Sequence, residues 1–480
     1  MHILDLCRSY LKKEAGGVAI MFAFFLVPFI SVTAIGIEVG RMLYAETKLS
    51  YAVDAAVIAA AKYDPAEAQQ NGEAMFHANF PSNFMGITAV PVVTISGDEK
   101  TIEVTAESDM PTIIGKFLDV DFLHVNAAAT VVRSFVGLEI AMVLDTTGSM
   151  NSGGKLNALK SAARNFVDII YGNNNTRDNT AISIVPYIMT MNVGNNKASW
   201  LSSAAGIPTP SSFPASEPWK GCVKNRLTGV GALTDDPPSV QKFETYFAES
   251  SYPFHPSWER WDNDWRLVEG AVQVVNTYGS SNIGPNLNCG EPILPLTNHK
   301  ANLQVKISSL NTQMGGTDGS RIVWGWRSIS PRWAGLWGGE AIKSYTASNN
   351  IKAIVMMTDG VNDVPGRPYV NAAVTAYETR SNPAIIGNNR RSTGGVYGAT
   401  TRPTATTAIN GAMGQVCAAI KAQGIEIYTV VLQVNNATTQ QLYKDCASSP
   451  DHYFQSDTTQ DLYDHFEKIA KSLNRIRISM

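Results

Sequence analysis

Residues 138–149 read LEIAMVLDTTGS, and this stretch decides the fold of the larger part of the chain. Its beginning is an almost unbroken apolar run, as expected for a strand buried on both faces of a parallel sheet. The run ends in Asp145, and a turn rich in side-chain oxygens follows at once. Because a buried parallel strand needs helices on both faces of its sheet, the stretch predicts an α/β architecture.

The chain after Phe135 continues this pattern, since strand-like apolar runs alternate with helical patterns. This alternation predicts a doubly wound sheet covered by helices on both faces. The expected strands are 138–145, 181–185, 351–357, 425–432 and 452–455, and the expected helices are 155–170, 407–423, 438–447 and 459–473.

Oxygen-bearing side chains follow the strands 138–145 and 351–357. Asp145, Thr147 and Ser149 alternate after the first strand, and Asp359 follows the second; Thr317 follows a pair of glycines between them. Ligands of open α/β sheets bind at the carboxyl edge, and Mg²⁺ prefers oxygen ligands in an octahedral array. Although each short motif alone is common in turns, their combination predicts a Mg²⁺ (or Mn²⁺) site of two carboxylates and three hydroxyls.

The same five residues resemble the metal-ion-dependent adhesion site (MIDAS) of von Willebrand factor A domains. That site has the pattern D-x-S-x-S, then a Thr, then an Asp. Asp145, Thr147 and Ser149 match its first loop, Thr317 the second and Asp359 the third. Thr147 departs from the serine of the family but keeps the hydroxyl. The resemblance implies an A-type fold whose metal has an open position for the Asp or Glu carboxylate of a partner protein.

Two irregular stretches interrupt the alternation, at about 188–300 and 363–406, and we interpret them as insertions. Four cysteines lie beyond the N-terminal apolar segment, and in an exported chain they permit three disulfide pairings. We favour Cys222–Cys289 and Cys417–Cys446, because each pair brackets one segment; buried free thiols are the alternative. We expect the tryptophans of the first insertion to form its core rather than a sugar-binding surface; they are Trp200, Trp219, Trp258, Trp261 and Trp265.

An uncharged apolar segment occupies residues 16–37. As a helix it spans about 33 Å, enough to cross a bilayer. Arg8, Lys12 and Lys13 precede it, so the positive-inside rule places the N-terminus in the cytoplasm and the bulk of the chain outside. A cleavable signal peptide is the alternative, but the run is longer than the usual apolar region of one, and helix-forming sequence continues beyond it. We expect an uncleaved, single-pass anchor.

This N-terminal segment also resembles the TadE/TadG-like proteins of tight-adherence (Flp-type) pilus assembly. Gly17–Ala23, Gly36–Arg41 and Ala52–Ala60 carry the resemblance, and Trp324–Pro331 (WGWRSISP) is similar to TadG-type sequence. Pseudopilins of this system have a Glu soon after a processing glycine, where this chain has Met21, so we expect no prepilin-type cleavage. The resemblance implies an assembly protein of the bacterial inner membrane, with its bulk in the periplasm or at the surface and with pilus or secretion-system components as partners.

The expected organisation combines a membrane anchor, a small β-rich unit and the doubly wound domain. The β-rich unit is indicated by short runs of β-branched residues with clear alternation at 101–106. The parts are a cytoplasmic tail (1–15), the anchor helix with its extension (16–62), a linker around a short helix (63–88), the β-rich unit (89–134) and a von Willebrand factor A-like domain (136–480).

The composition and the missing motifs narrow the class of function. The net charge of −3 includes no basic excess of the kind that nucleic-acid binding requires. None of the seven histidines lies in the three oxygen-rich loops, and neither a GxSxG motif nor a P-loop is present. We therefore predict a non-enzymatic, membrane-anchored assembly or adhesion protein without catalytic residues. The alternative is a metal-dependent hydrolase of the cell envelope, with the metal activating water.

Overall fold

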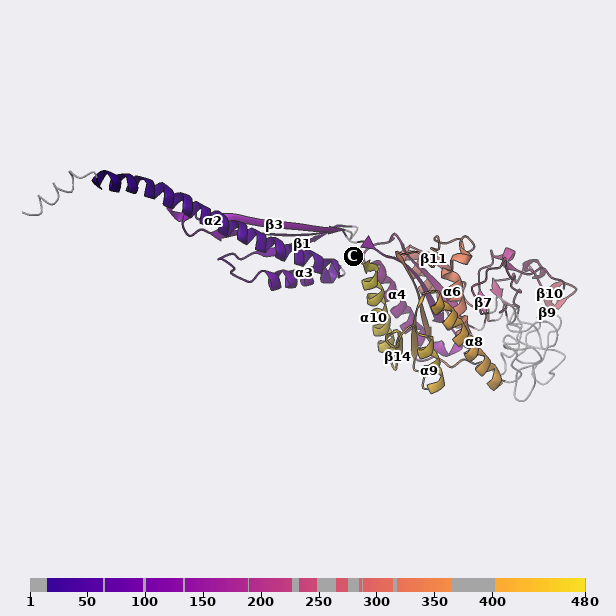
Figure 1. Cartoon of the computed structure of the whole chain (residues 1–480). Helices are drawn as coiled ribbons and strands as arrows, with labels where there is room; N and C mark the ends of the chain where they lie inside the picture. The colour runs from indigo at the N-terminus through magenta and orange to yellow at the C-terminus, as the bar shows by residue number, and fades with distance from the viewer. Residues whose placement is uncertain are drawn as a thin grey trace, which may run out of the picture. The chain divides into compact units, whose positions relative to one another are not determined.

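In the computed structural model the chain is divided into two compact units (Figure 1). Unit 1 comprises Met1–Phe135 with Ile478–Met480, and unit 2 comprises Val136–Arg477. The structure describes residues 15–63, 65–97, 101–132, 134–188, 190–226, 233–247, 265–274, 285–286, 288–313, 317–363 and 402–479.

Unit 1 is built on the 47-residue helix α2 (Ala15–Ala61) and an antiparallel sheet of order β1-β2-β3. The side chains of α2 are mostly exposed before Ala45, whereas small residues from there onward are buried against the sheet and α3. Alternate residues of β2 face this core, as the pattern at 101–106 predicts. The remaining elements are α3 (Pro65–Asn79), β1 (Val90–Ile95), β2 (Thr101–Pro111), η1 (Gly115–Leu118), β3 (Phe122–Val132), β4 (Ser134–Phe135) and β15 (Ile478–Ser479).

Two segments of unit 1 pack more closely than the sequence suggested. Residues 63–88, expected as a linker around a short helix, contain the helix α3, and its Phe76 is buried in the same core as α2 and the sheet. The end of the chain returns to this unit, because β15 pairs with β4 in antiparallel fashion. This pairing joins segments far apart in the sequence, so local patterns could not reveal it.

Unit 2 contains a six-stranded sheet of order β11-β6-β5-β12-β13-β14. When these six strands are numbered 1 to 6 in chain order, their order across the sheet is 3-2-1-4-5-6, which is the order of a doubly wound fold. All neighbours are parallel except β11, which is antiparallel to β6. The expected α/β fold is confirmed. The strands are β5 (Gly137–Asp145), β6 (Thr180–Tyr187), β11 (Leu294–Thr297), β12 (Asn350–Thr358), β13 (Glu426–Leu432) and β14 (Tyr453–Ser456).

Helices cover both faces of this sheet. Successive residues of β5 alternate between two cores: Ile140 and Met142 pack on one face, while Ala141 and Val143 pack on the other. The first face is covered by α4 (Lys155–Tyr171), α5 (Lys300–Ser309) and α10 (Thr459–Arg477), and the second by α6 (Ile322–Ile329), α8 (Arg402–Ala422) and α9 (Ala437–Cys446). Short 3-10 turns are η2 (Gly148–Asn151), η3 (Ala198–Trp200), η4 (Pro210–Ser212), η6 (Gly319–Arg321), η7 (Pro331–Trp333) and η9 (Pro450–His452).

The first insertion packs on the second face through aromatic residues. Trp200, Trp219 and Trp265 are at most 5% exposed and belong to its core, whereas Trp258 and Trp261 lie outside the described residues. Most of the second insertion also lies outside them. Within the first insertion the described strands are β7 (Met191–Asn192), β8 (Cys222–Val223), β9 (Trp265–Val268) and β10 (Ala271–Val274).

The sheet strand β11 falls inside the range 188–300 that the sequence assigned to the insertion. It reads LPLT, is four residues long and lies at an antiparallel edge. A proline removes a backbone donor and is tolerated at an edge, so this strand has neither the length nor the composition that marks a buried one. The irregular part therefore ends before Leu294.

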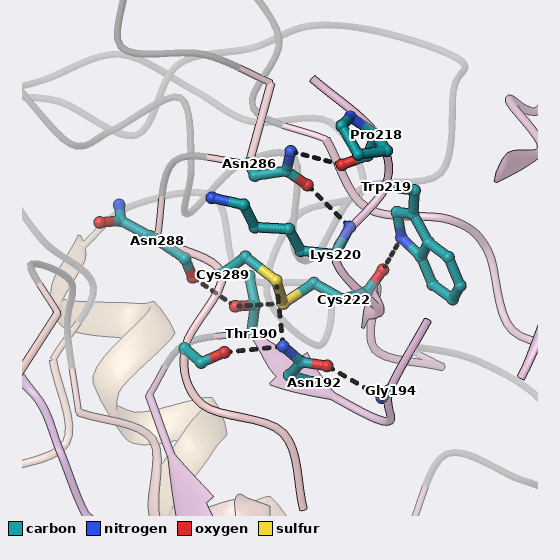
Figure 2. The surroundings of a disulfide bond; sticks show 11 residues. Thr190, Asn192, Gly194, Pro218, Trp219, Lys220, Cys222, Asn286, Asn288 and Cys289 are labelled. Carbon is teal, nitrogen blue, oxygen red and sulfur yellow. Dashed lines mark hydrogen bonds between the residues drawn. A yellow bond between two sulfur atoms is a disulfide. The ribbon is translucent and has the colours of Figure 1, made fainter. Parts of the chain in front are cut away.

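Both disulfides that the sequence analysis favours are present. Cys222–Cys289 closes a loop of sequence separation 67, and Cys417–Cys446 joins α8 to α9. Hydrogen bonds surround the first: the Asn192 side-chain amide donates to the Gly290 carbonyl at 2.7 Å, and the Trp219 indole donates to the Cys222 carbonyl at 2.8 Å. Figure 2 shows Asn192, Trp219 and Cys222 around this disulfide. The disulfide thus lies within a hydrogen-bonded cluster that ties the insertion together.

Candidate metal centre

The predicted ligands meet where the winding of the sheet reverses. Asp145 is the last residue of β5, and Asp359 follows β12 directly. These two strands are parallel neighbours, so their carboxyl ends lie side by side. In the strand order 3-2-1-4-5-6 they are strands 1 and 4, the point at which doubly wound sheets bind ligands.

The first loop gathers its oxygens around Asp145. The Oδ1 atom of Asp145 accepts hydrogen bonds from the backbone N–H of Thr147 at 2.8 Å and from its hydroxyl at 2.6 Å. The Thr147 hydroxyl lies 3.1 Å from the Ser149 hydroxyl, which donates to Oδ1 of Asp359 at 2.5 Å. The loop therefore connects the two carboxylates through two hydroxyls.

Thr317 completes the group, because its hydroxyl lies 3.4 Å from that of Thr147. Backbone contacts hold its segment on both sides: Gln313 N–H donates to the Thr146 carbonyl, and Asp363 N–H donates to the Thr317 carbonyl, each at 2.9 Å. The two glycines that precede Thr317 lie outside the described residues. The structure thus brings together all five residues predicted as ligands.

The donor set and its spacing fit a small, hard cation. Oxygens on adjacent vertices of an octahedron around Mg²⁺ lie about 3.0 Å apart, given metal–oxygen distances of about 2.1 Å. The hydroxyl pairs Thr147–Ser149 and Thr147–Thr317, at 3.1 and 3.4 Å, are close to this spacing. Over the part of the chain that the structure describes, no group of three or more His, Cys, Asp and Glu side chains that could hold a metal ion is present, so this site depends on its hydroxyls as well as its two carboxylates.

Burial makes the ionised Asp145 carboxylate unfavourable without a cation beside it. Asp145 is fully buried, and the Asp359 side chain is also inaccessible. Burial, with the negative charge of Asp359 beside it, raises the pKa of Asp145 from 3.8 to about 6. A nearby cation reverses such a shift by stabilising the ionised form. Ser149 is exposed, so the group opens to solvent on its side.

Lys155 is a charged neighbour that the sequence analysis missed. Its ammonium lies 2.9 Å from Oδ2 of Asp359, on the side away from Ser149's contact with Oδ1. Gly153 and Gly154 have φ values of 60° and 72°, a left-handed conformation that glycine adopts without strain, and they lead directly into α4 at Lys155. A lysine shortly after this glycine pair is the sequence signal that could have indicated it.

Two further residues support Asp145 from behind. The Thr358 hydroxyl donates to Oδ2 of Asp145 at 2.8 Å, and the Tyr187 hydroxyl donates to the same oxygen at 3.3 Å. Burial raises the pKa of Tyr187, so its phenol stays a hydrogen-bond donor. Thr358 and Tyr187 are the last residues of β12 and β6, so their positions in the sequence indicate the carboxyl edge of the sheet. Their residue types, however, do not distinguish them from ordinary core residues.

Comparison with protein families supports the N-terminal resemblance. The model of the Flp pilus-assembly TadE/G-like family matches residues 16–63. This segment is TadE/G-like. The TadE/G-like segment coincides with α2, and within the described residues Ile20–Ala61 is the one helix long and apolar enough to cross a membrane. No curated protein matches the chain.

Several solved structures are similar to the chain at low identity. One is the von Willebrand factor domain of the type V pili tip protein Mfa5 from Porphyromonas gingivalis, with 14% identity, 72% of this chain and 98% of that chain covered, and a TM-score of 0.37. Another is the pilus adhesin SpaC from Lactobacillus rhamnosus GG, with 10% identity, coverage of 81% and 34%, and a TM-score of 0.34. A third is proximal thread matrix protein 1 from the mussel byssus with a zinc-occupied MIDAS motif, with 10% identity, coverage of 71% and 46%, and a TM-score of 0.30.

Proposed function

We propose that this chain is a membrane-anchored, exported assembly or adhesion protein of a bacterial pilus system, which binds a partner protein through a divalent metal. The observation that carries the proposal is the meeting of five oxygen-bearing side chains at the switch point of a doubly wound sheet. They are Asp145, Thr147, Ser149, Thr317 and Asp359, and they would hold Mg²⁺ (or Mn²⁺). The metal would supply a Lewis-acidic position for an oxygen ligand of the partner.

The charge around the site favours a carboxylate as that ligand. The carboxylates of Asp145 and Asp359 and the ammonium of Lys155 together carry a net charge of −1. Asp318, next to Thr317, is compensated by its ion pair with Arg321 at 3.1 Å. A divalent cation would make the site net positive, and an Asp or Glu side chain of the partner would neutralise it.

Anchoring and export have separate support. The TadE/G-like segment contains the apolar helix, and the positive residues that precede it favour a cytoplasmic N-terminus in the bacterial inner membrane. The pairs Cys222–Cys289 and Cys417–Cys446 suit an oxidising compartment, so the bulk of the chain would lie in the periplasm or at the surface. Its partners would be pilus or secretion-system components.

The proposal is tested by titrating the full chain in nanodiscs with Mg²⁺ or Mn²⁺ in a calorimeter. We expect binding in the parent and none in Asp359→Ala, whereas Asp464→Ala, which removes an exposed carboxylate of α10, should bind as the parent does. Pull-down of pilus components should then require the metal and fail in EDTA. Absence of metal binding in the folded parent contradicts the proposed site. Turnover of an ester, phosphate or peptide substrate that Asp359→Ala abolishes would favour the hydrolase instead.

A further inference from the structure

Helix α2 has an inverted distribution of polarity just after its apolar run. Glu38 is 6% exposed, and the Arg41 side chain is 18% exposed. In the same stretch Val39 and Leu43 are 46% and 56% exposed. A helix in water turns its charged residues outward and its apolar residues inward. The reverse pattern is typical of a helix surrounded by lipid, whose few ionisable residues face protein and are paired.

The inward-facing Glu38 holds the tip of a hairpin. Oε1 of Glu38 accepts hydrogen bonds from the backbone N–H groups of Ile113 and Ile114, both at 2.6 Å, and Oε2 accepts one from Arg41 at 2.7 Å. The hairpin tip, residues 112–121, connects β2 to β3, which runs beside α2 (Figure 1). The tip is therefore fixed at the level of α2 where the uncharged run ends.

Several backbone groups of the hairpin tip have hydrogen-bond partners within unit 1. Besides the two bonds to Glu38, the Thr112 hydroxyl donates to the Val120 carbonyl at 2.6 Å, and Val120 N–H donates to the Gly115 carbonyl at 3.0 Å. Backbone groups need such partners when water is scarce, because each unsatisfied one costs several kcal/mol in a bilayer.

Exposed apolar side chains lie on the tip and directly beside it. Ile113 is 64% exposed and Val120 41%, and Phe122, the first residue of β3, is 60% exposed. From this geometry we infer that the hairpin tip is a second membrane contact, lying in the bilayer interface with Ile113 among the upper acyl chains. The inference rests on the proposed membrane anchoring.

A lipid surface explains these features better than a second protein copy. A bilayer that surrounds the exposed residues of α2, from Phe24 (79% exposed) to Leu43, reaches the level of the hairpin tip without any further assumption. Tyr44, 55% exposed, follows this stretch at the depth where aromatic residues collect at membrane interfaces. The tip itself carries exposed Lys116, Asp119 and Asp121, with a net charge of −1, so the proposed contact should form on a zwitterionic surface and need no anionic lipid.

The test measures the depth of single labels in the full chain. A Cys7→Ser background leaves the four remaining cysteines in disulfides. Ile113→Cys would then be labelled with an environment-sensitive fluorophore in phosphatidylcholine nanodiscs, with and without a lipid carrying a quencher near the headgroup. Phe29→Cys, 71% exposed within the apolar run, is the control for the anchor. Val305→Cys, 69% exposed on α5 of unit 2, is the aliphatic control for a site in water.

We expect the emission of the label at position 113 to be shifted to the blue and to be quenched by the lipid with the headgroup quencher. The label at position 305 should keep its emission. A label at 113 that stays as water-exposed as the one at 305, with the label at 29 quenched by a deep quencher, overturns the hairpin contact but leaves the anchor intact. A blue-shifted label at 113 that no lipid quencher reaches also overturns it, because a protein surface then covers the tip. If the label at 29 is not quenched either, the anchoring itself is wrong.

Discussion

Replacing Asp145 with Asn should make the metal-free protein more stable and abolish its stabilisation by Mg²⁺. The pKa of Asp145 is about 6 in the folded chain, against 3.8 as its ordinary value. The native state therefore binds the proton more tightly than the unfolded state, and the free energy of unfolding falls as the pH rises through this window. Well above pH 6 the full loss in the free energy of unfolding is present, and it amounts to about 3 kcal/mol for two pKa values that differ by about 2.

The surroundings of Asp145 accommodate an amide. The side-chain oxygen of an Asn can still accept from Thr147, and its NH₂ group would face the hydroxyls of Thr358 and Tyr187, which can rotate to accept. We therefore expect a gain approaching 3 kcal/mol for the metal-free variant at neutral pH. The parent should in turn gain about 2.7 kcal/mol from Mg²⁺ at one hundred times its dissociation constant, and the variant nothing.

Urea denaturation followed by tryptophan fluorescence measures both effects. All nine tryptophans lie between positions 200 and 337, within unit 2, so the signal reports on the unit that contains the site. The full chain would be unfolded in detergent, in EDTA or in Mg²⁺, beside Asp464→Asn as a variant that removes an exposed carboxylate. A metal-free Asp145→Asn protein less stable than the parent would refute the argument from the buried charge. Equal stabilisation of both proteins by Mg²⁺ would show that the metal binds elsewhere.

Three other outcomes can be checked with the same preparation. The affinity for Mg²⁺, measured by calorimetry, should be about tenfold weaker at pH 5 than at pH 7.5, since protons compete for an Asp145 with a pKa of about 6; a pH-independent affinity contradicts this. The double substitution of Cys222 and Cys289 by Ser should lower the free energy of unfolding of unit 2 by about 4 kcal/mol, which is the loop-closure entropy of their 67-residue separation. An unchanged urea midpoint would mean that the disulfide hardly constrains the unfolded chain. Lys352→Met should lower the free energy of unfolding by roughly 3–5 kcal/mol, because it leaves the buried Glu139 carboxylate without its ion-pair partner. The double variant Glu139→Leu/Lys352→Met should recover most of this loss. Equal losses in the single and the double variant would mean that packing, and not the ion pair, is responsible.

The sequence by itself indicated the class of fold, and it singled out the five oxygen-bearing residues that we propose as metal ligands. Apolar runs such as 138–145 and 351–357 have the length and composition of strands buried on both faces, and a polar residue directly after such a strand lies at the carboxyl edge of a parallel sheet. Both statements depend on periodicity and on short-range order, which are properties of the chain read in one dimension. The same holds for the apolar helix, whose length and lack of charge are visible without any contact.

Only the tertiary structure decided what surrounds these features. The contact between Lys155 and Asp359 spans 204 residues, and that between Glu38 and Ile113 spans 75. No local pattern encodes such pairs, because they depend on which strands become neighbours and on where each loop then passes. The edge strand β11 was missed for the same reason: it is stabilised by pairing with β6 and not by its own composition. A charged residue near an apolar run reads as a boundary in sequence, and only the fold reveals that Glu38 faces inward to hold a hairpin.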